Sequence, residues 1–183
     1  MADIVVPTLG ESVTEATVAR WAKKAVSSLA DMAEGSSFHR VLWDDAQQKN
    51  GKTTIELKPD EQIRRVILCS GKVYYDLLDE REKRGVDDVY LLRLEQFYPW
   101  PMKSVTTELS RFRGAELVWC QEEPKNMGGW GFVEPWLEVS LTKQKLKMKR
   151  PRYVGRPASA STAAGLMSRH LKELEAFLNE ALA

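Results

Sequence analysis

From residue 63 onward, short apolar runs alternate with segments in which apolar residues recur every three or four positions. The runs predict strands at residues 65–69, 89–94, 116–120 and 152–154. Between the first two runs, Tyr74, Leu77 and Leu78 share one face of a predicted helix that ends at Gly85. Alternation of this kind is typical of α/β proteins, in which helices cover a mostly parallel sheet.

Two further helices are predicted on either side of the third strand. Residues 105–112 carry apolar side chains at i, i+4 and i+7, and Gly114 ends that segment. The stretch through Trp136 and Val139 is amphipathic and is also predicted to be helical. We expect Trp136 to lie in the core, as we do for Trp119 of the third strand.

The last helix has the clearest periodicity. Ser161 or Thr162 is predicted to cap its start, because a hydroxyl oxygen can accept a hydrogen bond from a free backbone N–H of the first turn. The apolar stripe of this helix contains Met167, Leu171, Leu174, Phe177, Leu178 and Leu182.

The pattern of apolar and polar residues changes twice before residue 63. These changes predict three parts: residues 1–25, 26–62 and 63–183. Residues 36–43 resemble a strand that could add to the edge of the sheet, and the polar residues after it break the pattern. We therefore expect residues 26–62 to form a connecting arm. Residues 1–25 contain two strand-like runs that do not continue the later alternation.

Composition narrows the functional classes. The 183 residues suffice for one α/β core, and 27 Lys and Arg against 26 Asp and Glu leave a net charge of +1, which argues against a nucleic-acid or membrane binder. Cys69 and Cys120 lie in apolar runs, so buried reduced thiols and a reducing compartment are expected. The first residues lack a basic or long apolar leader, so we expect a bacterial cytoplasmic protein.

Ligands of open parallel sheets collect where strands end and helices begin. This rule selects a strand-end cleft with Ser70, Lys72, Gln121 and Glu122. Ser70 to Lys72 lack the glycine spacing of a phosphate-binding loop, so a simple strand-to-helix turn is favoured. Glu122 and the adjacent Glu123 would point to opposite sides of a strand, so ion pairing is favoured over acid–base chemistry.

A basic run leads into the predicted start of the last helix. It contains Lys143, Lys145, Lys147, Lys149, Arg150, Arg152 and Arg156. We predict a weak anion or acyl-CoA site there, with Arg156, Ser159 and Ser161 as ligands and Arg152 adding positive field, because helix N-termini favour anions. A solvated basic face is the alternative reading of the same charges.

No catalytic set is visible. The sequence contains no Gly-Asp-Gly run with a following Asn at the distance used to hold Mg²⁺ and a diphosphate, and no Cys/His or Ser/His/Asp set. We therefore predict no catalytic residue, no metal site and no cofactor in this chain.

Four strings carry a resemblance to a known family. They are SFHRVLWD at 37–44, VILCSGKVYYDL at 66–77, VWCQEEP at 118–124 and GRPASAS at 155–161. With these strings, residues 26–183 resemble the C-terminal domain of the thiamine-dependent, decarboxylating component of 2-oxoglutarate dehydrogenase. The resemblance implies a three-layer α/β/α sandwich of the transketolase C-terminal type.

The resemblance also implies a role. In this family, an oxidative decarboxylase of the tricarboxylic acid cycle, earlier domains hold thiamine diphosphate and Mg²⁺. The C-terminal domain supports a homodimer, borders the active-site entrance and in some members takes part in regulation by acetyl-CoA. The other components of the 2-oxoglutarate dehydrogenase complex are the implied partners.

Residues 1–25 resemble a different protein of the same complex, the start of the lipoyl domain of dihydrolipoamide succinyltransferase. The match stops after Lys23, Lys24 and Ala25, before the hairpin that would carry the lipoylated lysine. Three hypotheses follow from the sequence: a dimerisation and regulatory module that is not catalytic alone, an acyl-CoA-binding or nucleotide-binding regulatory domain, and a non-functional chimeric reading frame.

Overall fold

The computed structural model describes residues 37–47, 53–143 and 150–183. The chain divides into two units, Met1–Phe38 and His39–Ala183. The predictions for residues 1–25, and for the lysines between 143 and 149, fall on residues whose structure or side chains lie outside this description. The fold reported below is that of the second unit.

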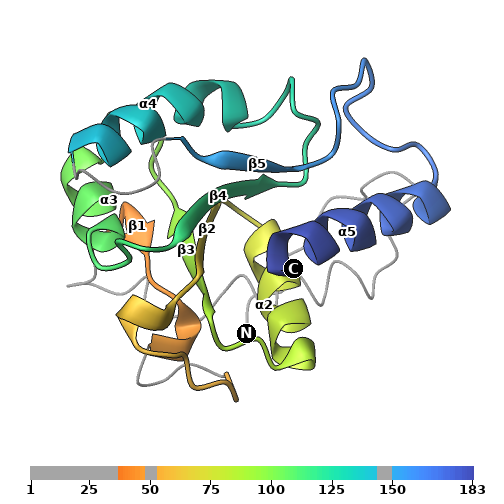
Figure 1. Cartoon of the computed structure of the whole chain (residues 1–183). Coiled ribbons are helices and arrows are strands. Elements are labelled where there is room, and N and C mark those ends of the chain that lie inside the picture. The colour runs from red at the N-terminus through yellow and green to blue at the C-terminus, as the bar shows by residue number, and fades with distance from the viewer. Residues whose placement is uncertain (1–36, 48–52, 144–149) are drawn as a thin grey trace, which may run out of the picture. The chain divides into compact units, whose positions relative to one another are not determined.

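The second unit is built on one five-stranded sheet (Figure 1). In spatial order its strands are β1 (Val41–Leu42), β3 (Val89–Leu94), β2 (Arg65–Cys69), β4 (Glu116–Gln121) and β5 (Arg152–Gly155). All neighbouring pairs are parallel except β1 and β3, which are antiparallel. The mostly parallel sheet is therefore confirmed, and within residues 36–43, which could add a strand to its edge, Val41 and Leu42 form the edge strand β1.

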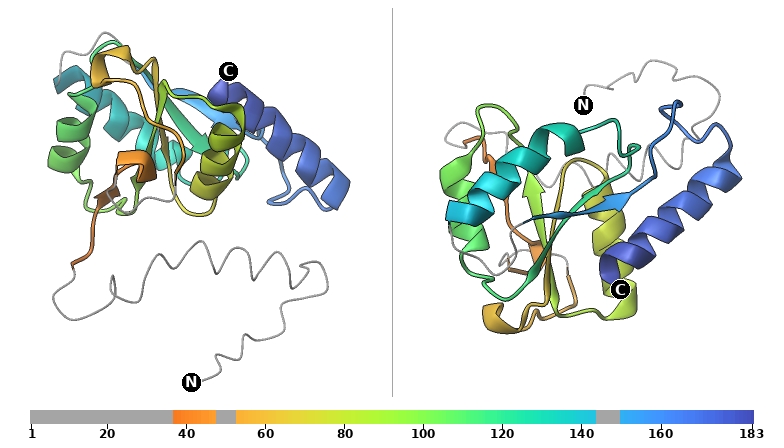
Figure 2. Two further views of the ribbon diagram at one scale, coloured as in Figure 1. Left: turned by 90° about the horizontal axis from the view of Figure 1, so that it is seen from below. Right: turned by 45° about the horizontal axis from the view of Figure 1, so that its top comes forward.

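Helices cover both faces of the sheet. The helix α2 (Val73–Arg84) and the helix α5 (Met167–Leu182) lie on one face, and α3 (Met102–Leu109) and α4 (Trp130–Lys143) lie on the other (Figures 1 and 2). Successive residues of a strand point to opposite faces, so Val66 and Leu68 pack under α3 and α4 whereas Ile67 and Cys69 pack under α2 and α5. The three-layer α/β/α sandwich is confirmed.

The start of the last helix was predicted wrongly. It begins at Met167, and neither Ser161 nor Thr162 caps it, because Gly165 adopts a left-handed φ of 76° and Leu166 is extended immediately before the helix. The apolar stripe also divides in two. Its C-terminal members from Phe177 onward are buried, but Met167 and Leu171 are 56% and 54% exposed because the first turns of α5 extend beyond the sheet (Figure 2).

The described residues of the predicted arm are an integral part of the sheet domain. After β1 come two short 3-10 helices, η2 (Asp45–Gln47) and η3 (Asp60–Gln62). Asp44, which lies between β1 and η2 in the chain, is fully buried, and its carboxylate binds the guanidinium of Arg81 from α2. The same carboxylate accepts a hydrogen bond from the backbone N–H of Leu91, 2.7 Å away. The arm is thus joined to both α2 and β3.

Candidate functional site

The carboxyl ends of β2 and β4 bring together two of the residues predicted for a strand-end cleft. The ammonium of Lys72 lies 2.6 Å from the Asp76 carboxylate and 3.6 Å from that of Glu122. His170 of α5 approaches the same Glu122 carboxylate at 3.9 Å. Ser70 lies half-buried at the end of β2. Ion pairing, which the sequence favoured for Glu122, is confirmed.

The electrostatics of this cluster favour a charged lysine. Partial burial opposes ionisation of Lys72, but the hydrogen bond to Asp76 and the charges of Asp76 and Glu122 outweigh it and raise the pKa of the ammonium. A lysine held in this way is a poor proton acceptor at neutral pH. Two carboxylates beside one ammonium also repel a diphosphate, so these residues do not fit thiamine diphosphate.

Gln121 does not face a cleft. Its side chain is buried and organises the turn that leads from β4 to α4. The amide oxygen accepts hydrogen bonds from the Trp119 indole N–H and the Trp130 backbone N–H, at 2.9 and 3.0 Å. The amide nitrogen donates to three backbone carbonyls of the turn. Gly128 adopts a left-handed φ of 65°, and a Cβ there would lie 3.0 Å from this nitrogen, so the turn favours glycine.

The guanidinium of Arg156 is bound to groups of the same chain. Its guanidinium is buried, lies 2.6 Å from the Glu173 carboxylate of α5 and donates to the carbonyl of Thr162. Arg169 approaches the same carboxylate at 2.8 Å, and the hydrogen bonds of the two arginines lower the pKa of Glu173. The positive charge that was predicted to bind an external anion is thus balanced by a carboxylate of the chain.

Ser159 and Ser161 lie in the loop before α5, not at a helix N-terminus. The backbone of Ser159 exchanges hydrogen bonds with the Asn126 side chain, and the Ser161 hydroxyl donates to the carbonyl of Ala163 at 2.7 Å. Without free helix N–H groups beside them, these serines lack the positive field on which the predicted anion site depended. The site stays a prediction, and the geometry does not favour it.

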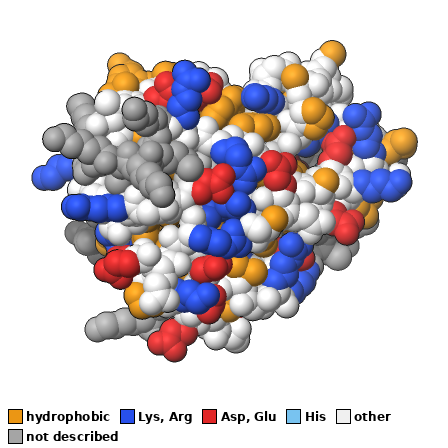
Figure 3. All heavy atoms as spheres, viewed as in Figure 1, with side chains coloured by type: hydrophobic (Ala, Val, Ile, Leu, Met, Phe, Trp, Pro, Cys, Tyr) orange, Lys and Arg blue, Asp and Glu red, His pale blue; other side chains and the backbone are white. Residues whose placement is uncertain are grey.

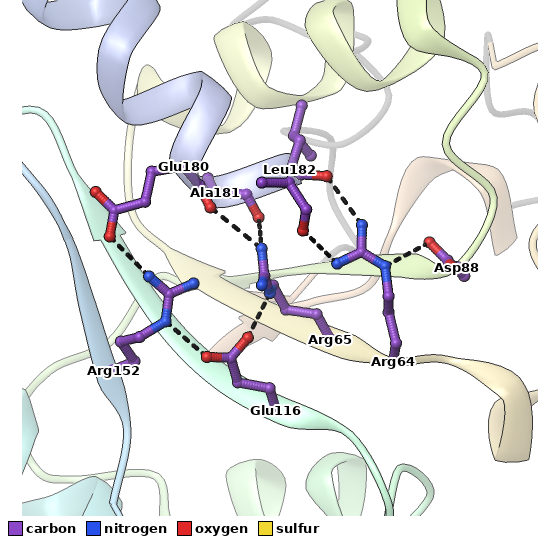
Figure 4. Close-up of polar contacts among 9 residues, drawn as sticks. Arg64, Arg65, Asp88, Glu116, Arg152, Glu180, Ala181 and Leu182 are labelled. Atoms are coloured by element: carbon purple, nitrogen blue, oxygen red, sulfur yellow. Dashed lines mark hydrogen bonds and ion pairs between the residues drawn. The ribbon is translucent and has the colours of Figure 1, made fainter.

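Arg152 lies at the other end of the sheet. Arg156 lies four residue steps further along the extended chain of β5, which corresponds to about 13 Å at about 3.3 Å per residue. Its guanidinium binds Glu116 at 2.6 Å and Glu180 at 2.7 Å (Figure 4). The charge of Arg152 is therefore balanced by two carboxylates of the chain.

Arg152 belongs to a network at the amino ends of β2 and β4, around the C-terminal turn of α5 (Figure 4). Arg65 binds the second oxygen of Glu116 and donates to the carbonyls of Glu180 and Ala181. Arg64 binds Asp88 and donates to the carbonyls of residues 182 and 183. Arginines satisfy carbonyls that a helix C-terminus leaves free and oppose the negative end of its dipole. The network is a structural clamp.

The sequence analysis missed the buried pair of Asp44 and Arg81. Arg81 lies four positions after Leu77 and seven after Tyr74, so helical spacing already places it on the buried face of α2. A charge on that face requires a buried partner. The Tyr74 hydroxyl accepts a hydrogen bond from the backbone of Asp45, and burial and the nearby carboxylates raise its pKa.

Residues 37–47, 53–143 and 150–183 bring together no group of three or more His, Cys, Asp or Glu side chains that could hold a metal ion. In the same residues no helix combines the length and apolarity needed to cross a membrane. The two cysteines are buried, and burial raises the pKa of both thiols. Buried neutral thiols react slowly.

Comparison with known proteins gives one consistent result. The family model described as 2-oxoglutarate dehydrogenase C-terminal matches residues 26–182. The 2-oxoglutarate dehydrogenase E1 component of Brucella ovis is 63% identical over 160 residues, and that of Brucella abortus strain 2308 is 62% identical over the same length. These alignments cover 87% of this chain but 16% of each relative.

Proposed function

The chain belongs to the 2-oxoglutarate dehydrogenase C-terminal family, and from this membership we propose that it acts as the C-terminal domain of a 2-oxoglutarate dehydrogenase E1 component. One observation carries the proposal: 63% identity extends over 160 residues, which is 87% of the chain. Identity at this level over a whole domain reaches the surface as well as the core. The surface is therefore expected to make the contacts that the relatives make.

In this proposal the domain contributes folding and association and carries no turnover of its own. Its ionised Lys72 is neutralised by two carboxylates and its Arg156 by a third, so neither is poised for acid–base or anion chemistry. Thiamine diphosphate and Mg²⁺ would be bound by parts of an E1 protein outside the matched segment. A homodimer and the other components of the complex are the proposed partners.

The acyl-CoA-binding alternative has less support. An acyl-CoA phosphate would have to displace the Glu173 carboxylate from a buried Arg156, and a charge-assisted hydrogen bond within a protein is worth about 1.5–3 kcal/mol. No other observation on the described residues favours that alternative over the association role.

A domain replacement tests the proposal. Residues 26–183 would replace the matched C-terminal 160 residues of the Brucella ovis E1 component, and 2-oxoglutarate-dependent reduction of an artificial electron acceptor would be measured. We expect the chimera to retain most of the parent's activity, whereas the parent truncated before the matched segment loses it. The purified 183-residue chain is expected to show no activity and no calorimetric binding of thiamine diphosphate with Mg²⁺.

Two results would contradict the proposal. One is a chimera that folds and is inactive, because the domain would then not replace its relative. The other is a truncated parent with full activity, because the domain would then be dispensable for the reaction.

A further inference from the structure

Helix α4 carries apolar side chains well beyond the face that packs against the sheet. Its inner face packs against the sheet, where Val133 and Leu137 are fully buried. Its outer face carries Phe132, Trp136 and Val139 at i, i+4 and i+7, and these side chains are 38%, 39% and 44% exposed. Trp136, which the sequence assigned to the core, is therefore on the outside. This apolar surface is wider than the stripe that a helix needs to pack on a sheet, and Glu134, Glu138 and Thr142 occupy the remaining side.

The outer face of α4 continues into the loop before α3. Phe97 stacks on Phe132 with ring centroids 6.4 Å apart and planes at 9°. Trp100 stacks on Trp136 at 6.2 Å and 16°, and its indole N–H is satisfied by the Ser140 hydroxyl of α4. The loop also carries Tyr98, which is 79% exposed. We call this surface the α4 aromatic face, and it comprises Phe97, Tyr98, Trp100, Phe132, Trp136 and Val139.

The α4 aromatic face has the composition of a protein interface. Interface cores are enriched in Trp, Tyr and Phe and poor in charge, and aromatic anchors carry much of the binding energy. Among the charged residues of α4, Glu138 is paired with Arg150 at 2.9 Å. Stacking holds the rings in fixed pairs, which lowers the entropy lost on docking. In Figure 3, hydrophobic side chains reach the surface at the upper left, on the side where Figure 1 places α4, with charged side chains beside them.

Two observations indicate what covers this face. The matched segment is 16% of the length of each E1 relative, so in those proteins the domain accompanies a much larger body. The described unit begins beside β1, and Val41 of β1 packs in the same core layer as Val133 and Leu137 of α4. A polypeptide that precedes this unit therefore enters it through a strand that packs into the α3 and α4 layer.

We propose that the α4 aromatic face is the surface on which this domain docks against the preceding part of an E1 polypeptide. The inference rests on the proposed function, because its occupant is the rest of that enzyme. It adds which of the two helical layers is internal in the complete protein. The layer of α2 and α5 then faces outward, together with the exposed Leu166, Met167 and Leu171 at the start of α5.

Site-specific photo-crosslinking in the active chimera tests the docking. Benzoylphenylalanine would be placed at the position of Tyr98, and a matched control would carry it at Leu171, which is exposed on the opposite layer. Crosslinked peptides would be identified by mass spectrometry. We expect position 98 to crosslink to peptides that precede the matched segment, and position 171 to give no such product.

Three outcomes would overturn the inference while leaving the proposed function intact, because the chimera is first shown to be active. They are crosslinks from position 98 only to a second copy of residues 39–183, no crosslink from position 98, and equal yields from both positions. An inactive chimera would instead count against the proposed function.

A variant pair gives a second measurement. Trp136→Lys should lower the Tm of the isolated 183-residue chain by only about 2–4 °C, since the ring is 39% exposed and loses mainly its stacking on Trp100, but should make the chimera sensitive to protease and lower its activity. Leu171→Lys should leave both proteins unchanged. A chimera that tolerates Trp136→Lys as well as Leu171→Lys would contradict the docking.

Discussion

The buried pair of Asp44 and Arg81 and the network around Glu116 both use arginine to join segments distant in sequence, yet their surroundings differ. Asp44 and Arg81 are fully buried, whereas Glu116, Arg65 and Arg152 keep some contact with water. A buried charge that loses its partner has no water to replace it, but a partly exposed one does. The pair should therefore be far more sensitive to substitution than the network.

The largest effect is expected for Arg81→Met. It leaves the Asp44 carboxylate buried without its partner, which should lower the free energy of unfolding by about 3–5 kcal/mol. Urea denaturation followed by circular dichroism measures the change. Lys83→Met on the exposed side of the same helix is the control, because its pair with Glu80 is on the surface. Equal losses for the two variants would remove the distinction drawn above.

A smaller effect is expected for Glu116→Gln. The amide keeps one acceptor for Arg65 or Arg152 but turns a donor toward the other, so the free energy of unfolding should fall by about 1–2 kcal/mol. Glu180→Gln, which touches Arg152 from a more exposed position, should cost less. If Glu116→Gln were as damaging as Arg81→Met, water would not be supporting the network.

The network should also give the domain an acid-sensitive component of stability. Partial burial opposes ionisation of Glu116, but the hydrogen bonds from Arg152 and Arg65 outweigh it and hold its pKa below the ordinary value of 4.5. A lowered carboxyl pKa in the folded state stabilises the fold above the unfolded-state pKa, and this contribution is lost as the pH falls through the folded-state pKa.

Denaturation series from neutral pH to below 4.5 check this expectation. Wild-type stability should fall more steeply with acid than that of Glu116→Gln, which has no proton to gain at this position. Parallel curves for the two proteins would show that Glu116 titrates alike when folded and unfolded.

The smallest effect is expected for Lys72→Met at the carboxyl ends of the strands. Its pairs with Asp76 and Glu122 are partly exposed and screened, so the free energy of unfolding should change by about 0.5 kcal/mol or less. Differential scanning calorimetry checks the change in Tm. A loss comparable to that of Glu116→Gln would mean that the two ends of the sheet are equally dependent on charge.

The strands were predictable because of their simple environment. Residues 65–69 and 89–94 match β2 and β3 residue for residue, since a parallel strand covered on both faces appears in the sequence as an apolar run between breaks. The start of α5 was not predictable from the sequence, because Ser161 has a hydroxyl that could cap a helix. Only the backbone conformations of Gly165 and Leu166 show that the helix begins later.

The candidate site was less predictable than the fold. We predicted that Arg152 and Arg156 act together because they are close in sequence. The extended strand β5 places them apart, so that Arg152 pairs with Glu180 and Arg156 with Glu173 of α5. The pairing of Asp44 with Arg81 depends on how the arm lies against β3, a register that two residues of strand do not specify. Family resemblance identified the domain without placing these side chains.

The clamp on the last turn of α5 has a consequence for biosynthesis. Arg64 and Arg65 bind carbonyls that lie 115–119 residues later in the chain, so an emerging polypeptide holds these arginines without their partners until nearly the whole domain has been made. Until then, the sheet face that α5 covers remains open, with Ile67 and Val118 in contact with water or with chaperones. Such late closure of long-range contacts slows folding and prolongs exposure to aggregation. The nascent domain should therefore be most prone to aggregation late in its translation, until α5 packs against the sheet.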